Sequence, residues 1–344
     1  MPNNSASDRL PVKRSLKKGP GLLISIAVIS TLCFLGVVIW VNWPKARPEP
    51  APLRHELKSL ISRIPGKSDA LIYIGMQEIR KSAFWQTVVP DSMKNVPFLG
   101  LGKRVDSLAK SREIVMSEDI DTLLLSFQRG KPGQNEFLAV VSGRVSGKIS
   151  ESSLKAGGAK TSNAAGRPCY AIDRDFWLCP IGGKRVAVSS SKKLIEQFLD
   201  PSGNFFQRDS LCTALIGKAL YKSQLWFVLP SAEWTGSALQ SLMSANRDMK
   251  EVGNLNRIRH MVLSTHFGDG IETETEWVYE TRRAAFFAST FLWGAAKLAA
   301  LSESRTGRQR MELLKTLHIQ QNLESVVIRA SLPKNLFRKE ESAP

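Results

Sequence analysis

The run GLLISIAVISTLCFLGVVIWVNW, from Gly21 to Trp43, carries no charged side chain. A hydrocarbon core of about 30 Å needs about 20 apolar residues in helical form, so this run is long enough to cross a bilayer. A cleaved signal peptide has an apolar core of about 7–15 residues and ends in small residues at its cleavage site. Here the run ends in VNWP, which favours an uncleaved transmembrane signal anchor over residues 21–43.

Basic residues dominate the segment before this run. Short basic flanks are retained on the cytoplasmic side of a membrane. We therefore expect residues 1–20 to be a cytoplasmic tail, and the protein to be a single-pass inner (plasma) membrane protein with its C-terminal part extracytoplasmic. Membrane lipid is then the first expected partner, through residues 21–43. Residues 44–52, PKARPEPAP, predict a stiff spacer because four of the nine residues are proline.

The chain has a net charge of +17, and the part after residue 52 contains 41 basic and 29 acidic residues. Such an excess gives either a solvated basic surface or attachment to an anionic partner, such as lipid headgroups, an envelope polymer or an acidic protein. Nucleic acid is not expected as a partner outside the cytoplasm. The strongest candidates for an anionic contact are four residues late in the chain: Arg305, Arg308, Arg310 and Lys315.

Strand and helix patterns repeat in one order in the two halves of the remaining chain. In each half, helical patterns follow the first and third strands, which gives the β-α-β-β-α-β order of a ferredoxin-like unit. The predicted fold class is therefore α+β, with an N-terminal transmembrane helix followed by two tandem ferredoxin-like units, residues 53–200 and 201–344. The strands of these units are expected at residues 69–76, 121–127, 136–145 and 168–172 in the first half, and at 224–229, 258–267, 271–279 and 325–332 in the second. Two further strands are expected in the first half, at residues 176–179 and 185–189.

The very apolar stretch 284–301 has two interpretations. It is long enough to be a second membrane span, but Lys297 lies well inside it. A charge in that position costs about 2.5–3.5 kcal/mol on insertion scales, which favours a buried helix packed on a sheet.

Two cysteines flank a short acidic turn at residues 173–175. In a hairpin, Cys169 would face Cys179 with α-carbons about 4.5–5.5 Å apart, which is within disulfide range. The alternatives are a disulfide, which an oxidising exterior permits, and two buried thiols. Cys212 is expected to be a small core residue.

Motifs that carry chemistry are weak throughout the chain. The stretch GRVSGK, residues 143–148, resembles a phosphate loop, but only three residues separate its glycines and Ile149 replaces the required Ser or Thr. The acidic residues at positions 272, 274 and 276 alternate along one predicted strand, which favours a solvated outer face over an acidic binding strip. We assign no catalytic, cofactor-binding or metal-binding residue, and we expect no cofactor.

Three segments carry a resemblance to known sequences: DALIYIGMQEIRKSAFW (residues 69–85), SEDID (residues 117–121) and SVVIRASLPKNLF (residues 325–337). They resemble a group of uncharacterised bacterial proteins with a single membrane anchor and an extracytoplasmic α+β domain. That group has no assigned activity, so the resemblance implies an architecture and a location but no catalytic residue.

These features lead to one main functional hypothesis and two alternatives. The anchor, the spacer and the basic outer segment favour a non-enzymatic interaction or scaffold protein of the cell envelope. The first alternative is an inner-membrane component of a secretion or type IV pilus platform, by analogy of fold alone. The second is an envelope enzyme whose site is assembled from residues distant in sequence, which would require a deep pocket with convergent polar groups.

Overall fold

The computed structural model describes residues 20–45, 52–94, 107, 110–130, 135–149, 151–156, 159–173, 176–219, 223–235, 257–301 and 314–337. The chain forms two compact units, residues 1–43 and residues 44–344. In the first unit, helix α1 covers Pro20–Asn42, and its side chains are described from Val28 onward. Across the described residues, no helix combines the length and the apolar character that a membrane crossing requires.

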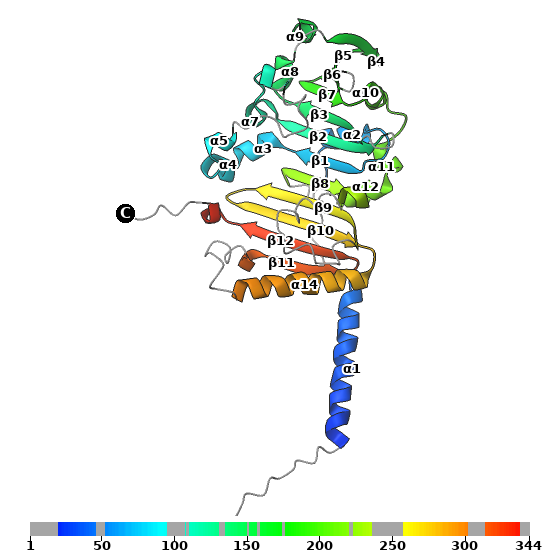
Figure 1. Cartoon of the computed structure of the whole chain (residues 1–344), viewed down its shortest axis with the longest axis vertical. Helices are drawn as coiled ribbons and strands as arrows, with labels where there is room; N and C mark the ends of the chain where they lie inside the picture. Colours follow the sequence, from blue (N-terminus) through cyan, green and yellow to red (C-terminus); the bar gives the residue numbers. More distant parts are fainter. Residues whose placement is uncertain are drawn as a thin grey trace, which may run out of the picture. The chain divides into compact units, whose positions relative to one another are not determined.

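A single antiparallel sheet of 12 described strands organises the second unit (Figure 1). Its strand order is β11-β12-β10-β9-β8-β1-β2-β3-β7-β6-β5-β4. The strands are β1 (Ala70–Ile74), β2 (Thr122–Arg129), β3 (Asn135–Ser142), β4 (Lys160–Ala164), β5 (Arg167–Asp173), β6 (Phe176–Gly182), β7 (Arg185–Ser189), β8 (Leu225–Leu229), β9 (Ile258–Phe267), β10 (Ile271–Tyr279), β11 (His318–Asn322) and β12 (Ser325–Leu332).

Helices cover both faces of this sheet. The first face is covered by α2 (His55–Ser62), α10 (Lys192–Leu199), α11 (Phe205–Arg208) and α12 (Ser210–Ile216). The second face is covered by α3 (Met76–Lys81), α8 (Val145–Lys148), α9 (Glu151–Ala156) and α14 (Arg282–Leu301). The remaining described helices are α4 (Ala83–Thr87), α5 (Asp91–Lys94), α7 (Met116–Asp119) and the 3-10 helix η3 (Lys334–Phe337).

Strand β1 contributes side chains to the hydrophobic cores on both faces of the sheet. Leu71 and Tyr73 point to the first face, and Ile72 and Ile74 point to the second, because successive side chains of a strand alternate. All four are apolar or aromatic, so the strand is buried on both sides. The same double burial in β2 explains its nearly continuous apolar run TLLLSF.

The predicted fold class is wrong in its arrangement of strands. In a ferredoxin-like unit, each crossover helix joins two parallel strands that are separated in the sheet by a third strand. Here strands that follow one another along the chain, such as β1, β2 and β3, are direct antiparallel neighbours. Each predicted unit instead begins with a meander, β1-β2-β3 in the first and β8-β9-β10 in the second. The two meanders join where β1 pairs with β8, so the sheet continues across the expected boundary between residues 200 and 201. The transmembrane helix in that fold class is likewise not found among the described helices.

The seam between the meanders is buried within the core. Trp226 of β8 pairs with Tyr73 of β1, and their rings stack with centroids 5.6 Å apart. Trp226 is fully buried. One sheet is favoured over two because separating the meanders would expose these aromatic side chains and the hydrogen-bonding edges of both strands.

Most predicted strands coincide with observed strands, but two were missed. Strands β4 (KTSNA) and β11 (HIQQN) are polar and occupy the two ends of the strand order. Edge strands often carry polar side chains, so they lack the apolar alternation by which a strand is recognised.

Candidate functional site

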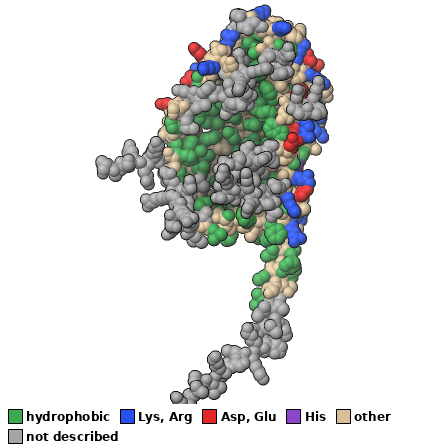
Figure 2. All heavy atoms as spheres, viewed as in Figure 1, with side chains coloured by type: hydrophobic (Ala, Val, Ile, Leu, Met, Phe, Trp, Pro, Cys, Tyr) green, Lys and Arg blue, Asp and Glu red, His purple; other side chains and the backbone are tan. Residues whose placement is uncertain are grey.

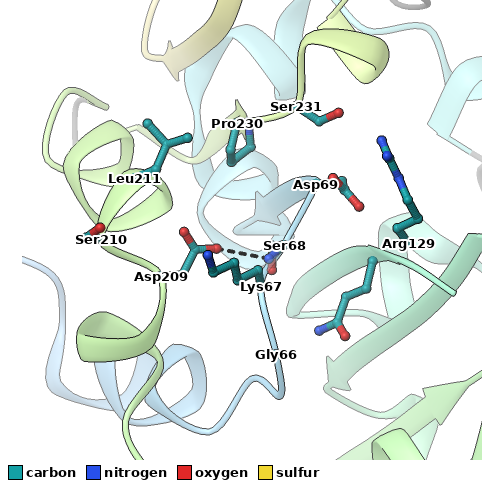
Figure 3. A pocket seen from close by; sticks show the side chains of 11 residues that line it. Gly66, Lys67, Ser68, Asp69, Arg129, Asp209, Ser210, Leu211, Pro230 and Ser231 are labelled. Carbon is teal, nitrogen blue, oxygen red and sulfur yellow. Dashed lines mark hydrogen bonds between the residues drawn. The ribbon is translucent and has the colours of Figure 1, made fainter.

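A cavity of about 560 Å³ lies at the ends of the three central strands, and we call it the midsheet cavity. Its walls come from four separate segments: residues 66–69 before β1, residues 128–129 at the end of β2, residues 209–211 at the start of α12 and residues 230–231 after β8. Figure 3 shows Asp209 and Lys67 on one side of it, and Asp69 and Arg129 on the other. The site is not recognisable in the amino-acid sequence, because its segments meet only in the folded chain, where β8, β1 and β2 pair.

Asp209 holds one wall of the midsheet cavity in place. Its carboxylate is buried and accepts hydrogen bonds from the backbone N–H groups of Ser68 and Cys212, each at 3.0 Å. Figure 3 shows the bond from Ser68. The bond from Cys212 caps the N-terminus of α12, which is a common role of aspartate in this position. The bond from Ser68 ties the segment before β1 to the same helix, so Asp209 positions the wall.

The charged groups at the cavity rim have both signs. Lys67 is exposed, and Arg129 forms an exposed ion pair with Glu233, with Nη2 2.6 Å from Oε2. The buried Gln128 donates its amide hydrogen to the carbonyl oxygen of Pro65. Hydrogen bonds within the protein thus occupy the buried polar groups of the wall, while the rim offers a cation and carboxylates to solvent. This arrangement suits the binding of a polar segment.

The predicted pair of cysteines lies together in the structure. Cys169 in β5 and Cys179 in β6 are free, fully buried thiols, and the neighbouring pair Tyr170–Leu178 sets the register that opposes them. A hydrogen bond between the thiols lowers the pKa of Cys169 and raises the pKa of Cys179. The disulfide itself stays a prediction, and the intact mass of protein purified without reductant tests it, since bond formation removes two hydrogens.

Cys212 is fully buried, and burial raises the pKa of its thiol. Cys212 is therefore a core residue, as its small apolar side chain predicts.

Of the four candidates for an anionic contact, Lys315 is exposed in the helical turn at residues 314–316. Arg305, Arg308 and Arg310 lie outside the described residues, so the anionic contact stays a prediction.

The acidic residues of β10 are not a solvated face. Glu274 and Glu276 are 6% and 3% exposed, which contradicts the expectation from their alternation. Glu274 pairs with Arg329 of β12, with Nε 2.5 Å from Oε2, and Glu276 pairs with Lys218, with Nζ 2.9 Å from Oε1. Neither pair is predictable from the sequence, because the basic partners are more than 50 residues away along the chain.

The stretch that resembles a phosphate loop ends in a lysine that pairs with another buried carboxylate. Lys148, at its end, places Nζ 2.6 Å from Oδ2 of Asp119, whose side chain is 3% exposed. Burial by itself raises the pKa of Asp119, but the hydrogen bonds from Lys148 and from the backbone of Val115 outweigh it and hold this pKa below its usual range. Lys148 therefore ties α8 to α7 through an ion pair.

Comparisons with known proteins add little to this description. No family model and no curated protein matches the chain. Among solved structures, the chain is similar to one titled "Structure of crystal form I of TP0453", with 12% sequence identity and a TM-score of 0.39, over 86% of this chain and 96% of that one. Similarity at this level supports no inference about function. Within the described residues, no cluster of histidine, cysteine, aspartate and glutamate has the grouping of a metal site.

Proposed function

We propose that this protein is an extracytoplasmic interaction or scaffold protein of the cell envelope. In this proposal, residues 21–43 contact membrane lipid, and the unit of residues 44–344 binds a partner protein. The midsheet cavity receives a polar segment of that partner. No reaction is assigned to the site.

The observation that carries the proposal is the construction of the midsheet cavity. Four segments far apart in sequence form it, and the buried Asp209 links two of them. Hydrogen bonds between its walls would hold such a recess in shape before binding, which would limit the entropy lost when a partner is ordered. Its rim carries Lys67 and Asp69, so it has a group for either charge of a partner's side chain.

Site-specific photo-cross-linking in cells tests partner binding. A photoreactive residue is placed at Leu211, which lines the cavity and is 42% exposed, and at the exposed Lys193 of α10 as a matched control. We expect a discrete adduct from position 211 and none from position 193. The filling substitution Ser210→Trp, at an exposed position of the lining, should abolish that adduct. Equal adducts from both positions would contradict the proposed site.

Location requires a separate test, because a partner could bind in either compartment. Alkaline phosphatase is fused after residue 51 and after residue 344. Activity at both positions is expected if the unit of residues 44–344 is extracytoplasmic. Inactivity at both positions would place this unit in the cytoplasm and would overturn the envelope role.

A further inference from the structure

Helix α14 has one face that anchors it to the sheet. Ala284, Ala285, Ala288 and Ser289 are buried and face the second side of the sheet, beneath β10, β11 and β12. Small side chains at these positions let the helix backbone approach the strands closely. Figure 1 shows the helix running beside β11, at the end of the strand order.

The opposite side of α14 exposes large apolar side chains, and we call it the α14 outer face. Phe287, Phe291, Trp293 and Leu298 are 48%, 52%, 54% and 70% exposed. Helical geometry places Phe287, Phe291 and Leu298 within one narrow stripe, whereas Trp293 lies on the other flank of the helix, roughly 120–160° around the axis from that stripe. Figure 2 shows hydrophobic side chains reaching the surface at the edge of the unit that α14 forms in Figure 1. Large apolar side chains that are exposed on both flanks of one helix indicate an interaction surface.

Two cations lie on the arc of α14 between this apolar stripe and Trp293. The Arg283 guanidinium lies 5.7 Å from the centroid of the Phe287 ring, and the Lys297 ammonium lies 5.9 Å from the centroid of the Trp293 ring. The sequence of α14 contains no aspartate or glutamate. A helix with aromatic side chains flanked by cations is complementary to an anionic lipid surface, where aromatic rings and the stems of basic side chains occupy the headgroup region.

The position of α14 within its unit supports lipid as the occupant. The backbone N–H of Lys45 donates to Oδ1 of Asn322 at 2.9 Å, and Arg282 at the start of α14 places Nε 2.8 Å from Oε1 of Glu324. Asn322 and Glu324 belong to one turn, between β11 and β12. The chain therefore enters the unit beside the start of α14. Lys45 follows the apolar run ending at Trp43 by two residues, which span at most about 7 Å.

We infer that the α14 outer face lies on the membrane surface and binds anionic lipid headgroups. The inference rests on the proposed lipid contact of residues 21–43, which would keep the start of α14 near the headgroups. It adds a second lipid contact, made by the folded unit itself. Such a contact would hold the sheet at a defined height and orientation above the membrane.

The test uses the full chain reconstituted in vesicles of phosphatidylcholine with and without phosphatidylglycerol. An environment-sensitive dye is attached at native Cys33, or, with Cys33→Ser, at Phe291→Cys or at Lys184→Cys in the exposed β6–β7 turn. Nitroxide-labelled lipid should quench the dye at positions 33 and 291 and leave the dye at position 184 unchanged. Quenching at position 291 should increase with phosphatidylglycerol. Arg283→Glu and Lys297→Glu should each reduce the lipid contact about fivefold.

The outcomes separate this inference from the proposed function. Quenching at position 33 without quenching at position 291 would overturn the α14 contact and leave the lipid contact of residues 21–43 intact. Loss of quenching at both positions would overturn both. Protection of position 291 from aqueous iodide that depends on protein concentration, without quenching by lipid, would assign the α14 outer face to a second copy of the chain and would also overturn the inference.

Discussion

The two meanders of the sheet use the same secondary structure with different side chains on the first face. In the meander β1-β2-β3, both faces are apolar, and helices cover each of them. In the meander β8-β9-β10, the second face is apolar beneath α14, while the first face of β10 carries buried carboxylates paired with Arg329 and Lys218. The difference teaches that an alternating strand such as IETETEWVY does not by itself predict a solvated face, because buried acidic residues are tolerated when basic partners neutralise them.

The largest expected effect comes from the seam that joins the two meanders. Trp226→Ala should lower the free energy of unfolding by about 3–5 kcal/mol, because it removes a fully buried indole stacked on Tyr73. Urea unfolding should show one transition, shifted as a whole, because both meanders share the sheet. The control Trp293→Ala removes the same residue type from the exposed face of α14 and should change stability by less than about 0.5 kcal/mol in the absence of lipid. Two separate transitions, with only one of them shifted, would show that the meanders unfold independently.

The next largest effect on stability is expected at Gly143, in the first half of the chain. Gly143 has φ +134°, and a β-carbon there would collide with the carbonyl oxygen of Asp119. Gly143→Ala should therefore destabilise the protein by about 2 kcal/mol or more. The matched control is Gly147→Ala in α8, where the space around an added β-carbon is open. Circular-dichroism melting of both variants measures the difference, and equal melting temperatures would contradict the close approach of Asp119.

The third prediction concerns the buried ion pair between Glu276 of β10 and Lys218. Glu276→Gln should cost about 1–3 kcal/mol, because Lys218 loses its carboxylate partner while the position stays buried. The control Glu272→Gln alters an exposed residue on the same face of the same strand and should have little effect. Urea unfolding of the two variants measures how much each substitution lowers the free energy of unfolding. A similar cost for both would mean that burial of Glu276 has no energetic consequence.

The smallest effect is a dependence of stability on pH in the first half. The pKa of Asp119 is lower in the folded state than in the unfolded state. Its contribution to stability is therefore complete above the unfolded pKa of about 3.9 and is lost as the pH falls through the folded value. Urea titrations below pH 5 should show a shallower decline for Asp119→Asn than for the unsubstituted protein. Parallel declines would contradict this role for the Asp119–Lys148 pair.

Contacts between residues close together in the sequence were predictable, whereas contacts between residues far apart in the sequence were not. The opposition of Cys169 and Cys179 followed from a short turn, because the register of a hairpin depends on local sequence. The ion pairs of Glu274 and Glu276 could not be recognised in the same way, since their partners come from β12 and from the segment after α12. The midsheet cavity was missed for the same reason.

The sequence by itself determined the apolar run of residues 21–43, the basic charge and most of the strands, because these depend on composition and on the alternation of neighbouring residues. Only the tertiary structure decided which strands are neighbours. The order β-α-β-β-α-β is compatible with a parallel crossover and with an antiparallel meander, and local patterns do not distinguish them. The pairing of β1 with β8, which brings together residues more than 150 positions apart, converts two expected units into one sheet and creates the midsheet cavity.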